Sequence, residues 1–140
     1  MLKKFYQFVI FPYTVFLLYL MFLGMGRFQF EENVVRVEPL FSTLKFIQNT
    51  ISWWDIVRIV VGNVVMFIPF GFWGWVFPKL QNLRDLLFTF VASIVVVEGL
   101  QYFTRLGLFE VDDVILNTFG VFLGYQIRVF LEKKFNRLVL

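Results

Sequence analysis

Residues 86–103, LLFTFVASIVVVEGLQYF, form an apolar run of 18 residues whose strongly polar members, Glu98 and Gln101, come near its end. A helix of that length extends about 27 Å, which is close to the thickness of the hydrocarbon core of a bilayer. A carboxylate in hydrocarbon costs roughly 2.5–3.5 kcal/mol on insertion scales, so Glu98 must face protein or water. The run therefore predicts a transmembrane helix with one polar face turned toward other helices.

Three further apolar runs lie at about 5–26, 56–77 and 114–131. The first is long enough to span a bilayer, carries bulky tyrosines and lacks a small-residue cleavage site. We therefore interpret it as a retained helix and not as a cleaved signal peptide. The predicted fold is an all-α integral membrane bundle of four transmembrane helices, forming a single domain over residues 1–140.

The composition agrees with a membrane protein. Apolar residues make up 59 % of the chain and charged residues 16 %, with a mean hydropathy of +0.76, whereas a soluble domain is about half apolar and a quarter charged. The chain has no cysteine and no histidine, which excludes disulfides, thiolate metal sites and histidine proton shuttles. The net charge of +3 is scattered, so no nucleic-acid partner is expected.

The distribution of lysine and arginine predicts the orientation, because cytoplasmic loops carry an excess of these residues. The larger group lies on the side of the N-terminus, with Arg128 within reach of it: Lys3, Lys4, Lys79, Arg84, Lys133, Lys134 and Arg137. The opposite side carries Arg27, Arg36, Lys45 and Arg105, with Arg58 just inside the second run. This predicts a multi-pass protein of the plasma membrane with both termini in the cytoplasm.

The segment 27–55 is the one long connection, and it lies on the outer side in this topology. Within it, Leu44, Ile47, Ile51 and Trp54 recur at spacings of three and four residues, which is typical of an amphipathic helix. We expect an interfacial helix in this first outer loop. An ordinary surface loop containing one helical turn is the alternative.

Polar residues within three of the runs gather near the predicted outer side. On a helix, residues three, four and seven positions apart share a face, so Glu98, Gln101 and Arg105 would lie together. The second run contributes Arg58 and Asn63, and the fourth begins with Asp112, Asp113 and Asn117. Since the runs alternate in direction and their inner halves hold almost no such groups, we expect an outward-facing polar pocket.

Four other residues are predicted to shape the bundle. Pro69, followed by Gly71, lies in the middle of the second run, and a proline removes one helical hydrogen bond, so a kink or break is expected there. Gly120 and Gly124 form a Gly-x-x-x-Gly pair that allows another helix to approach closely. That helix could belong to this chain or to a second subunit in an oligomer.

Three functions remain open for the polar cluster. Its residues could be ion pairs that hold the bundle together, or they could bind a polar headgroup or a glycopeptide-like ligand. They could also be catalytic, with Glu98, Asp112 and Asp113 acting on a lipid headgroup as acid and base or around a divalent cation. The sequence lacks a nucleophile elbow, a phosphate-binding glycine loop and zinc-ligand spacing, which favours binding over catalysis. No cofactor and no metal ligand set are therefore predicted, and membrane lipid is the expected partner.

Three motifs in this part of the chain resemble the VanZ-like family of small bacterial membrane proteins. They are the Asn63-x-x-x-Phe67-x-Pro69-x-Gly71 segment, the Glu98-x-x-Gln101 pair followed by Arg105, and the ending Asp112-Asp113-x-x-x-Asn117-x-x-Gly120-x-x-x-Gly124. The outer loop departs from the family pattern Asn-Leu-x-Pro-Phe, because this chain has Val37-Glu38-Pro39-Leu40-Phe41. The resemblance implies a multi-spanning plasma-membrane protein, and the family's founding member is associated with resistance to the lipoglycopeptide teicoplanin. The predicted function is thus binding of a lipid-linked envelope precursor or such an antibiotic, with an enzyme or a structural subunit as alternatives.

Overall fold

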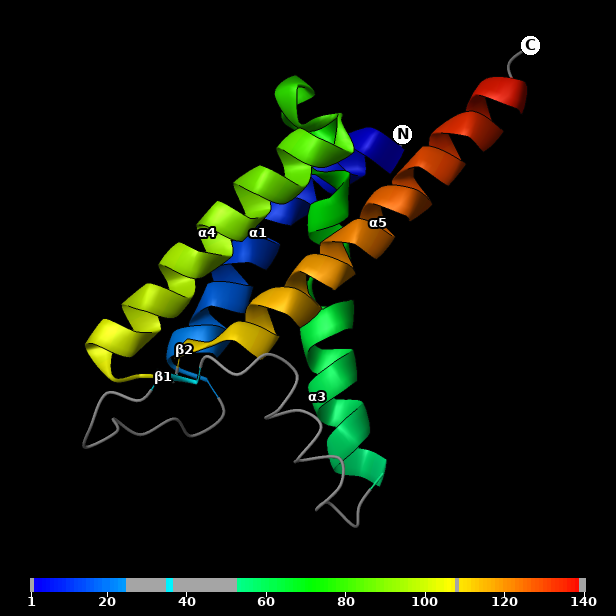
Figure 1. Cartoon of the computed structure of the whole chain (residues 1–140). Coiled ribbons are helices and arrows are strands. Elements are labelled where there is room, and N and C mark those ends of the chain that lie inside the picture. Colours follow the sequence, from blue (N-terminus) through cyan, green and yellow to red (C-terminus); the bar gives the residue numbers. More distant parts are fainter. Residues whose placement is uncertain (1, 25–34, 37–52, 108, 139–140) are drawn as a thin grey trace.

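The computed structural model describes residues 2–24, 35–36, 53–107 and 109–138. Its long elements are four helices, α1 (Leu2–Phe22), α3 (Trp53–Val65), α4 (Leu83–Thr104) and α5 (Val111–Leu138) (Figure 1). Two short 3-10 helices, η1 (Ile68–Trp75) and η2 (Pro78–Leu80), connect α3 to α4. Two strands of two residues each, β1 (Val35–Arg36) and β2 (Phe109–Glu110), pair in parallel, with Val35 opposite Phe109.

Three helices of the described part are long and apolar enough to cross a membrane: Leu2–Phe22, Leu83–Thr104 and Val111–Lys134. They correspond to the first, third and fourth predicted runs, each with ends shifted by a few residues. The predicted all-α membrane architecture is therefore confirmed for these three spans. Most of the predicted interfacial helix, residues 44–52, lies outside the described residues, and its last predicted residue, Trp54, belongs to α3, where it is exposed.

The second predicted run is not one continuous helix. Its α-helical part ends at Val65, and after a turn at Met66 and Phe67 the chain continues as η1, with Pro69 near its start. The predicted break at Pro69 is confirmed, because proline has no N–H to donate to the preceding turn. A 3-10 helix rises about 2.0 Å per residue, so η1 continues the path of α3 in a more extended form.

The helix α1 supplies the hydrogen bonds that this broken segment lacks. The Tyr13 hydroxyl donates to the Met66 carbonyl oxygen at 2.6 Å, and the Tyr6 hydroxyl donates to the Pro69 carbonyl oxygen at 2.8 Å. The Gln7 Nε2 group donates to the carbonyl oxygen of Trp75 at 2.6 Å. Non-helical backbone at membrane depth is tolerated where protein satisfies it, and α1 does so from one side.

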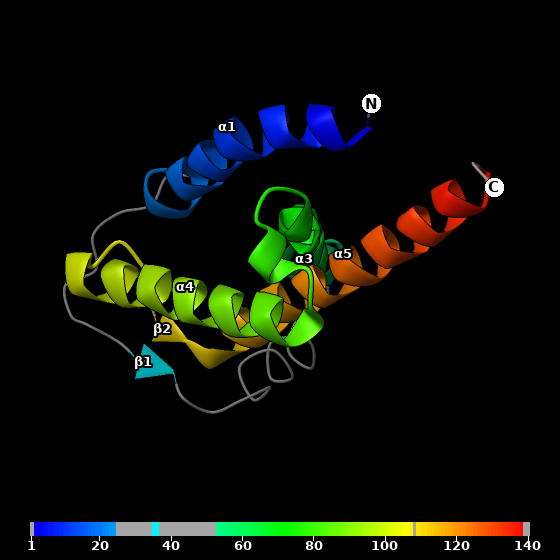
Figure 2. The ribbon, with the colours of Figure 1, turned by 90° about the horizontal axis from the view of Figure 1, so that it is seen from above.

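The segment η1 lies in the middle of the bundle. Seen from above, it lies between α1 on one side and α4 with α5 on the other (Figure 2). Its Phe70 is buried and contacts Phe67, Phe90 and Tyr13 at ring-centroid distances of 5.7, 6.1 and 6.0 Å. This aromatic cluster forms the centre of the core and joins α1, η1 and α4.

The two glycines of α5 lie directly against the backbone of the α3–η1 segment. A Cβ atom at Gly120 would meet the carbonyl oxygen of Val64, and one at Gly124 would meet that of Ile68. Gly71 of η1 faces the backbone of Gly124 in return. The close approach predicted from the Gly-x-x-x-Gly spacing therefore occurs within this chain, so a second subunit docking on these glycines would have to displace η1.

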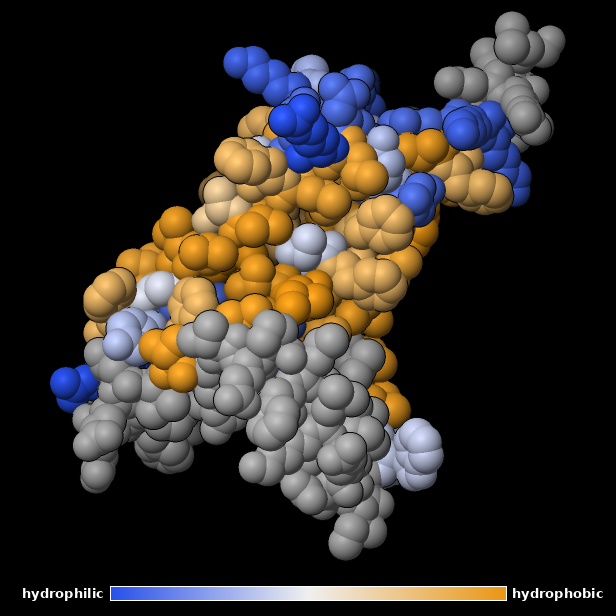
Figure 3. Space-filling model, viewed as in Figure 1, coloured by the Kyte–Doolittle hydropathy of each residue, from blue (hydrophilic) through white to orange (hydrophobic). Residues whose placement is uncertain are grey.

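The helix α1, the α3–η1 segment, α4 and α5 alternate in direction, so both termini lie at one end of the molecule (Figure 1). We call this the termini end, and the opposite end, where α1 and α4 finish and α5 begins, the far end. Figure 3 shows hydrophilic residues at the termini end above a broad hydrophobic band. The exposed cations at the termini end are Lys3, Lys4, Lys79, Arg84, Lys133 and Lys134.

Candidate functional site

The buried stripe of α4 changes from apolar to polar as it approaches the far end. Leu86, Phe90 and Ile94 are buried at intervals of four residues, and Glu98 and Gln101 continue the same stripe. Both polar side chains are only 2 % exposed. The predicted burial of Glu98 and Gln101 on one helical face is thus confirmed, and their polar groups lie inside the bundle.

Gln101 ties the ends of two helices together. Its Nε2 group donates a hydrogen bond of 2.8 Å to the carbonyl oxygen of Met21 in the last turn of α1. Carbonyls at the end of a helix have no partner within that helix, so Gln101 satisfies one of them. This contact places the end of α1 beside the polar stripe of α4.

Arg105 does not share the buried face of Glu98 and Gln101. The helix α4 ends at Thr104, and Arg105 caps it in the left-handed conformation with φ of 59°. Its side chain is exposed. The prediction from helical spacing was wrong here, because the spacing rule applies only while the helix continues.

The start of α5 supplies the second group of buried polar residues. Asp112 is 3 % exposed and Asn117 is 2 % exposed. The partly buried Asp113 accepts a hydrogen bond of 2.9 Å from the Nδ2 group of Asn63 on α3. The predicted proximity of the second and fourth runs at this end is therefore confirmed by one direct contact.

The Asn117 side chain is buried with part of its hydrogen-bonding capacity unused. Its Oδ1 atom accepts no hydrogen bond from the residues that the structure describes. An unsatisfied buried acceptor costs about 1–3 kcal/mol. A donor from outside the described residues would therefore stabilise this side chain. Asn117 lies one turn after Asp113 on α5, on the face that continues through Gly120 and Gly124.

Two further predictions concern Arg58 and the carboxylates as possible metal ligands. Arg58 lies on α3, five positions before Asn63, but its side chain is outside the described residues. Within the described segments, no three carboxylates lie together in a way that could hold a metal ion. The buried polar groups at the far end are therefore Glu98, Gln101, Asp112 and Asn117, and the hydrogen bond from Asn63 to Asp113 joins α3 to α5 beside them.

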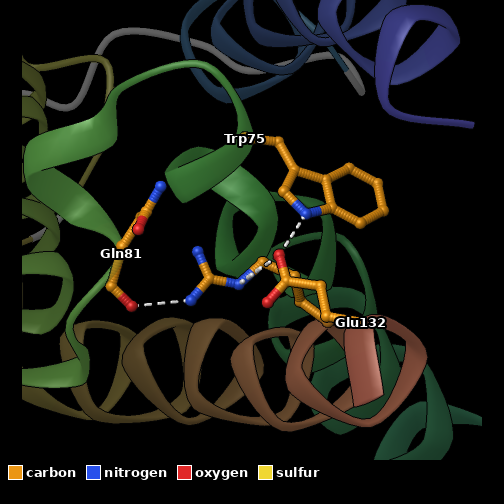
Figure 4. A network of polar contacts seen from close by, with 4 residues as sticks. Trp75, Gln81 and Glu132 are labelled. Carbon is orange, nitrogen blue, oxygen red and sulfur yellow. Dashed lines mark hydrogen bonds and ion pairs between the residues drawn. The ribbon is translucent and has the colours of Figure 1, made fainter. Parts of the chain in front are cut away.

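A second buried polar cluster lies at the termini end and was not predicted. Its centre is Arg128 of α5, which is 2 % exposed and donates from Nη2 to the Gln81 carbonyl oxygen at 2.7 Å. The Arg128 Nε atom lies 3.9 Å from Oε1 of Glu132. The same oxygen accepts a hydrogen bond of 2.5 Å from Nε1 of Trp75 (Figure 4). The cluster joins α5 to η1 and to the connection that follows η2.

The inner halves of the predicted runs hold almost no polar groups, and this second cluster was missed there. In the sequence, Arg128 contributes to the prediction of orientation, but in the structure it lies on the same face of α5 as Asn117, Val121 and Gly124, at spacings of four, three and four residues. That spacing, in an otherwise apolar run, was the signal of an inward-facing cation. The guanidinium also lies 4.8 Å from the centroid of the Tyr125 ring, close enough for a cation–π interaction.

Comparison with known proteins gives two matches. The family described as VanZ/LLP1 matches residues 8–132. The protein VanZ of Enterococcus faecium is 29 % identical over 111 residues, which cover 79 % of this chain and 62 % of that protein. The chain therefore spans less than two thirds of this relative's length. No solved structure matches the chain.

Proposed function

The chain belongs to the VanZ/LLP1 family, and we propose that it binds an amphiphilic ligand of the cell envelope at its far end. The observation that carries this proposal is the buried amide of Asn117, whose Oδ1 atom accepts no hydrogen bond from the described residues. A ligand hydroxyl, amide or ammonium group would supply the missing donor. Asp113 and Asn63 hold each other one turn away, so the groups around Asn117 are already positioned.

The surroundings of this site suit a ligand with one polar and one apolar part. On α4, the face opposite the buried stripe that ends in Glu98 and Gln101 is apolar and exposed, with Val96, Leu100 and Phe103. A headgroup held at the far end would leave its hydrocarbon chain among apolar surfaces of this kind, where burial of hydrocarbon contributes about 25 cal/mol per Å². A lipid-linked envelope precursor and a lipoglycopeptide such as teicoplanin both have this chemistry, which gives the chain a proposed role in antibiotic resistance.

The proposed topology has four crossings, with α3 and η1 together forming the second. The far end then faces outward, and both termini lie in the cytoplasm at the plasma membrane. The support is the larger number of exposed lysines and arginines at the termini end, because such residues accumulate on the cytoplasmic side. A site at the far end would in that case meet ligands in the outer leaflet.

Binding to the chain in lipid nanodiscs tests the proposal, with fluorescent teicoplanin and a fluorescent polyprenyl-diphosphate lipid as separate probes. We expect at least one probe to bind, and Asn117→Ala and Glu98→Gln to weaken that binding by roughly tenfold. Gln126→Leu is the matched control, because Gln126 is an exposed amide on the same helix. If neither probe binds to the folded protein, the proposal is overturned.

A membrane enzyme is the second candidate, because Glu98 and Asp112 are two buried carboxyl groups near the same end. Such groups can serve as acid and base on a lipid headgroup. If the wild-type protein turns over a purified lipid and Asp113→Asn abolishes this turnover, the enzyme is favoured over simple binding. If Glu98→Gln instead unfolds the chain and neither probe binds the wild type, the cluster is structural.

A further inference from the structure

Arg128 is a buried cation with most of its hydrogen-bonding capacity unused. A guanidinium carries five N–H groups and stays charged in proteins. The side chain is 3 % exposed, and Nε and Nη1 donate no hydrogen bond to the described residues, while Nη2 donates to Gln81. Burying a charge is costly unless its hydrogen bonds are satisfied, so this guanidinium is suited to an anion with several oxygens.

Glu132 is an incomplete partner for this guanidinium. Its Oε1 atom lies 3.9 Å from Nε, which is longer than a hydrogen bond. The same oxygen accepts a hydrogen bond from Trp75 Nε1, and the Glu132 side chain is 45 % exposed. Glu132 is therefore a half-exposed anion at the edge of the cluster, and moving it into solvent would break one hydrogen bond, from Trp75.

The packing leaves one side of the guanidinium for a ligand. Gly74 of η1 lies directly against Nη1, so that a Cβ atom at this position would collide with it. Nη2 is directed toward the Gln81 carbonyl oxygen. The Nε side, which Glu132 covers, is the remaining route for an incoming anion.

The depth of the cluster matches that of lipid headgroups. Arg128 lies six residues before Lys134, which is about 9 Å along a helix. Its partner Gln81 belongs to the connection between η2 and α4, and both Lys79 of η2 and Asn82 of the connection are exposed. A long cationic side chain that extends from an apolar helix toward the interface is positioned to meet phosphates there.

We propose that Arg128 binds the phosphate of an anionic phospholipid in the leaflet at the termini end, with Glu132 moving aside to admit it. Phosphate oxygens suit the planar guanidinium because they can accept two parallel hydrogen bonds from it. Exposed Lys133, Lys134 and Arg84 surround this end and raise the local concentration of anions. This site lies at the opposite end from the proposed envelope-ligand site and depends on none of its residues.

Native mass spectrometry of the detergent-solubilised chain tests this site, with dioleoyl phosphatidylglycerol and dioleoyl phosphatidylcholine as probes. We expect phosphatidylglycerol to bind roughly tenfold more tightly, and Glu132→Gln to increase that affinity roughly fivefold by removing the competing anion. Asp85→Asn is the matched control, because Asp85 is also an exposed acid at this end. Equal effects of the two variants, or no effect of Glu132→Gln, would overturn the proposal.

Two further measurements separate the remaining possibilities. Arg128→Gln should abolish the preference for phosphatidylglycerol, with folding checked by circular dichroism. If that variant does not fold, the comparison of Glu132→Gln with Asp85→Asn decides. Competition by glycerol phosphate and by inorganic phosphate tests the source of the phosphate. Displacement of the lipid by either at equal concentration would mean that a soluble phosphate is the ligand, and the lipid assignment would be wrong.

Discussion

The hydroxyl of Tyr13 donates a hydrogen bond of 2.6 Å to the carbonyl oxygen of Met66, 53 positions further along the chain. Met66 lies in the turn that separates α3 from η1. Together with the contacts of Tyr6 and Gln7, this bond makes α1 the partner that satisfies backbone carbonyls of the broken α3–η1 segment. The stability of that segment should therefore depend on side chains of α1.

Tyr13→Phe is expected to lower the free energy of unfolding by about 0.6–1.7 kcal/mol, the range for hydrogen bonds between helices in membranes. The ring would still pack against Phe70, so only the hydrogen bond is lost. Unfolding titrations in mixed micelles would measure the change. Tyr19→Phe is the control, since Tyr19 is exposed on the same helix. An equal decrease in the free energy of unfolding for this control would show that the Tyr13 hydrogen bond does not stabilise the fold.

Gly124→Ala should prevent α5 from packing on η1, because the added methyl would meet the Ile68 carbonyl oxygen and the Gly71 Cα atom. Backbone atoms cannot move aside cheaply, so we expect a loss of at least about 2 kcal/mol or failure to fold. Gly99→Ala on α4 is the matched control, since nothing lies within 4 Å of its added Cβ. That variant should be neutral or stabilised by up to about 1 kcal/mol. Thermal unfolding of both in one detergent measures the difference, and similar melting temperatures would contradict the packing described.

The contact between Asn63 and Asp113 should appear as a coupling energy. We expect a double-mutant cycle of Asn63→Ala and Asp113→Ala to give about 1–2 kcal/mol, because the hydrogen bond is 2.9 Å long and joins two helices. The coupling energy is calculated from the free energies of unfolding of the wild type, the two single variants and the double variant. Strict additivity of the two substitutions would mean that the two side chains do not interact in the membrane.

The orientation can be tested by thiol labelling, because the chain contains no cysteine. A single cysteine at Lys79 or at Lys134 should be protected from a membrane-impermeant maleimide in intact cells and react after permeabilisation. A cysteine at Arg105 should react in intact cells, since this exposed residue lies at the far end. The reverse pattern would place the termini outside and the proposed ligand site in the cytoplasm.

Much of the fold follows from local patterns. The long apolar runs predicted α1, α4 and α5, and Pro69 predicted the break in the second run. The burial of Glu98 and Gln101 was predicted from the free-energy cost of placing a polar side chain in hydrocarbon, because such a side chain must face protein or water. Arg105 was placed wrongly, because the sequence does not reveal that α4 ends at Thr104 in a left-handed cap.

By itself, the sequence determined that the chain is helical, lies in a membrane, and buries Glu98, Gln101 and Asn117. These properties follow from hydrophobicity and helical spacing, which act over a few residues. Only the tertiary structure decided that α1 completes the hydrogen bonds of the broken α3–η1 segment, that Gly120 and Gly124 pack against this segment, and that Arg128 is buried beside Glu132. The reason is that each of these contacts joins atoms whose proximity depends on how whole helices pack, and residue types alone do not encode which helices become neighbours.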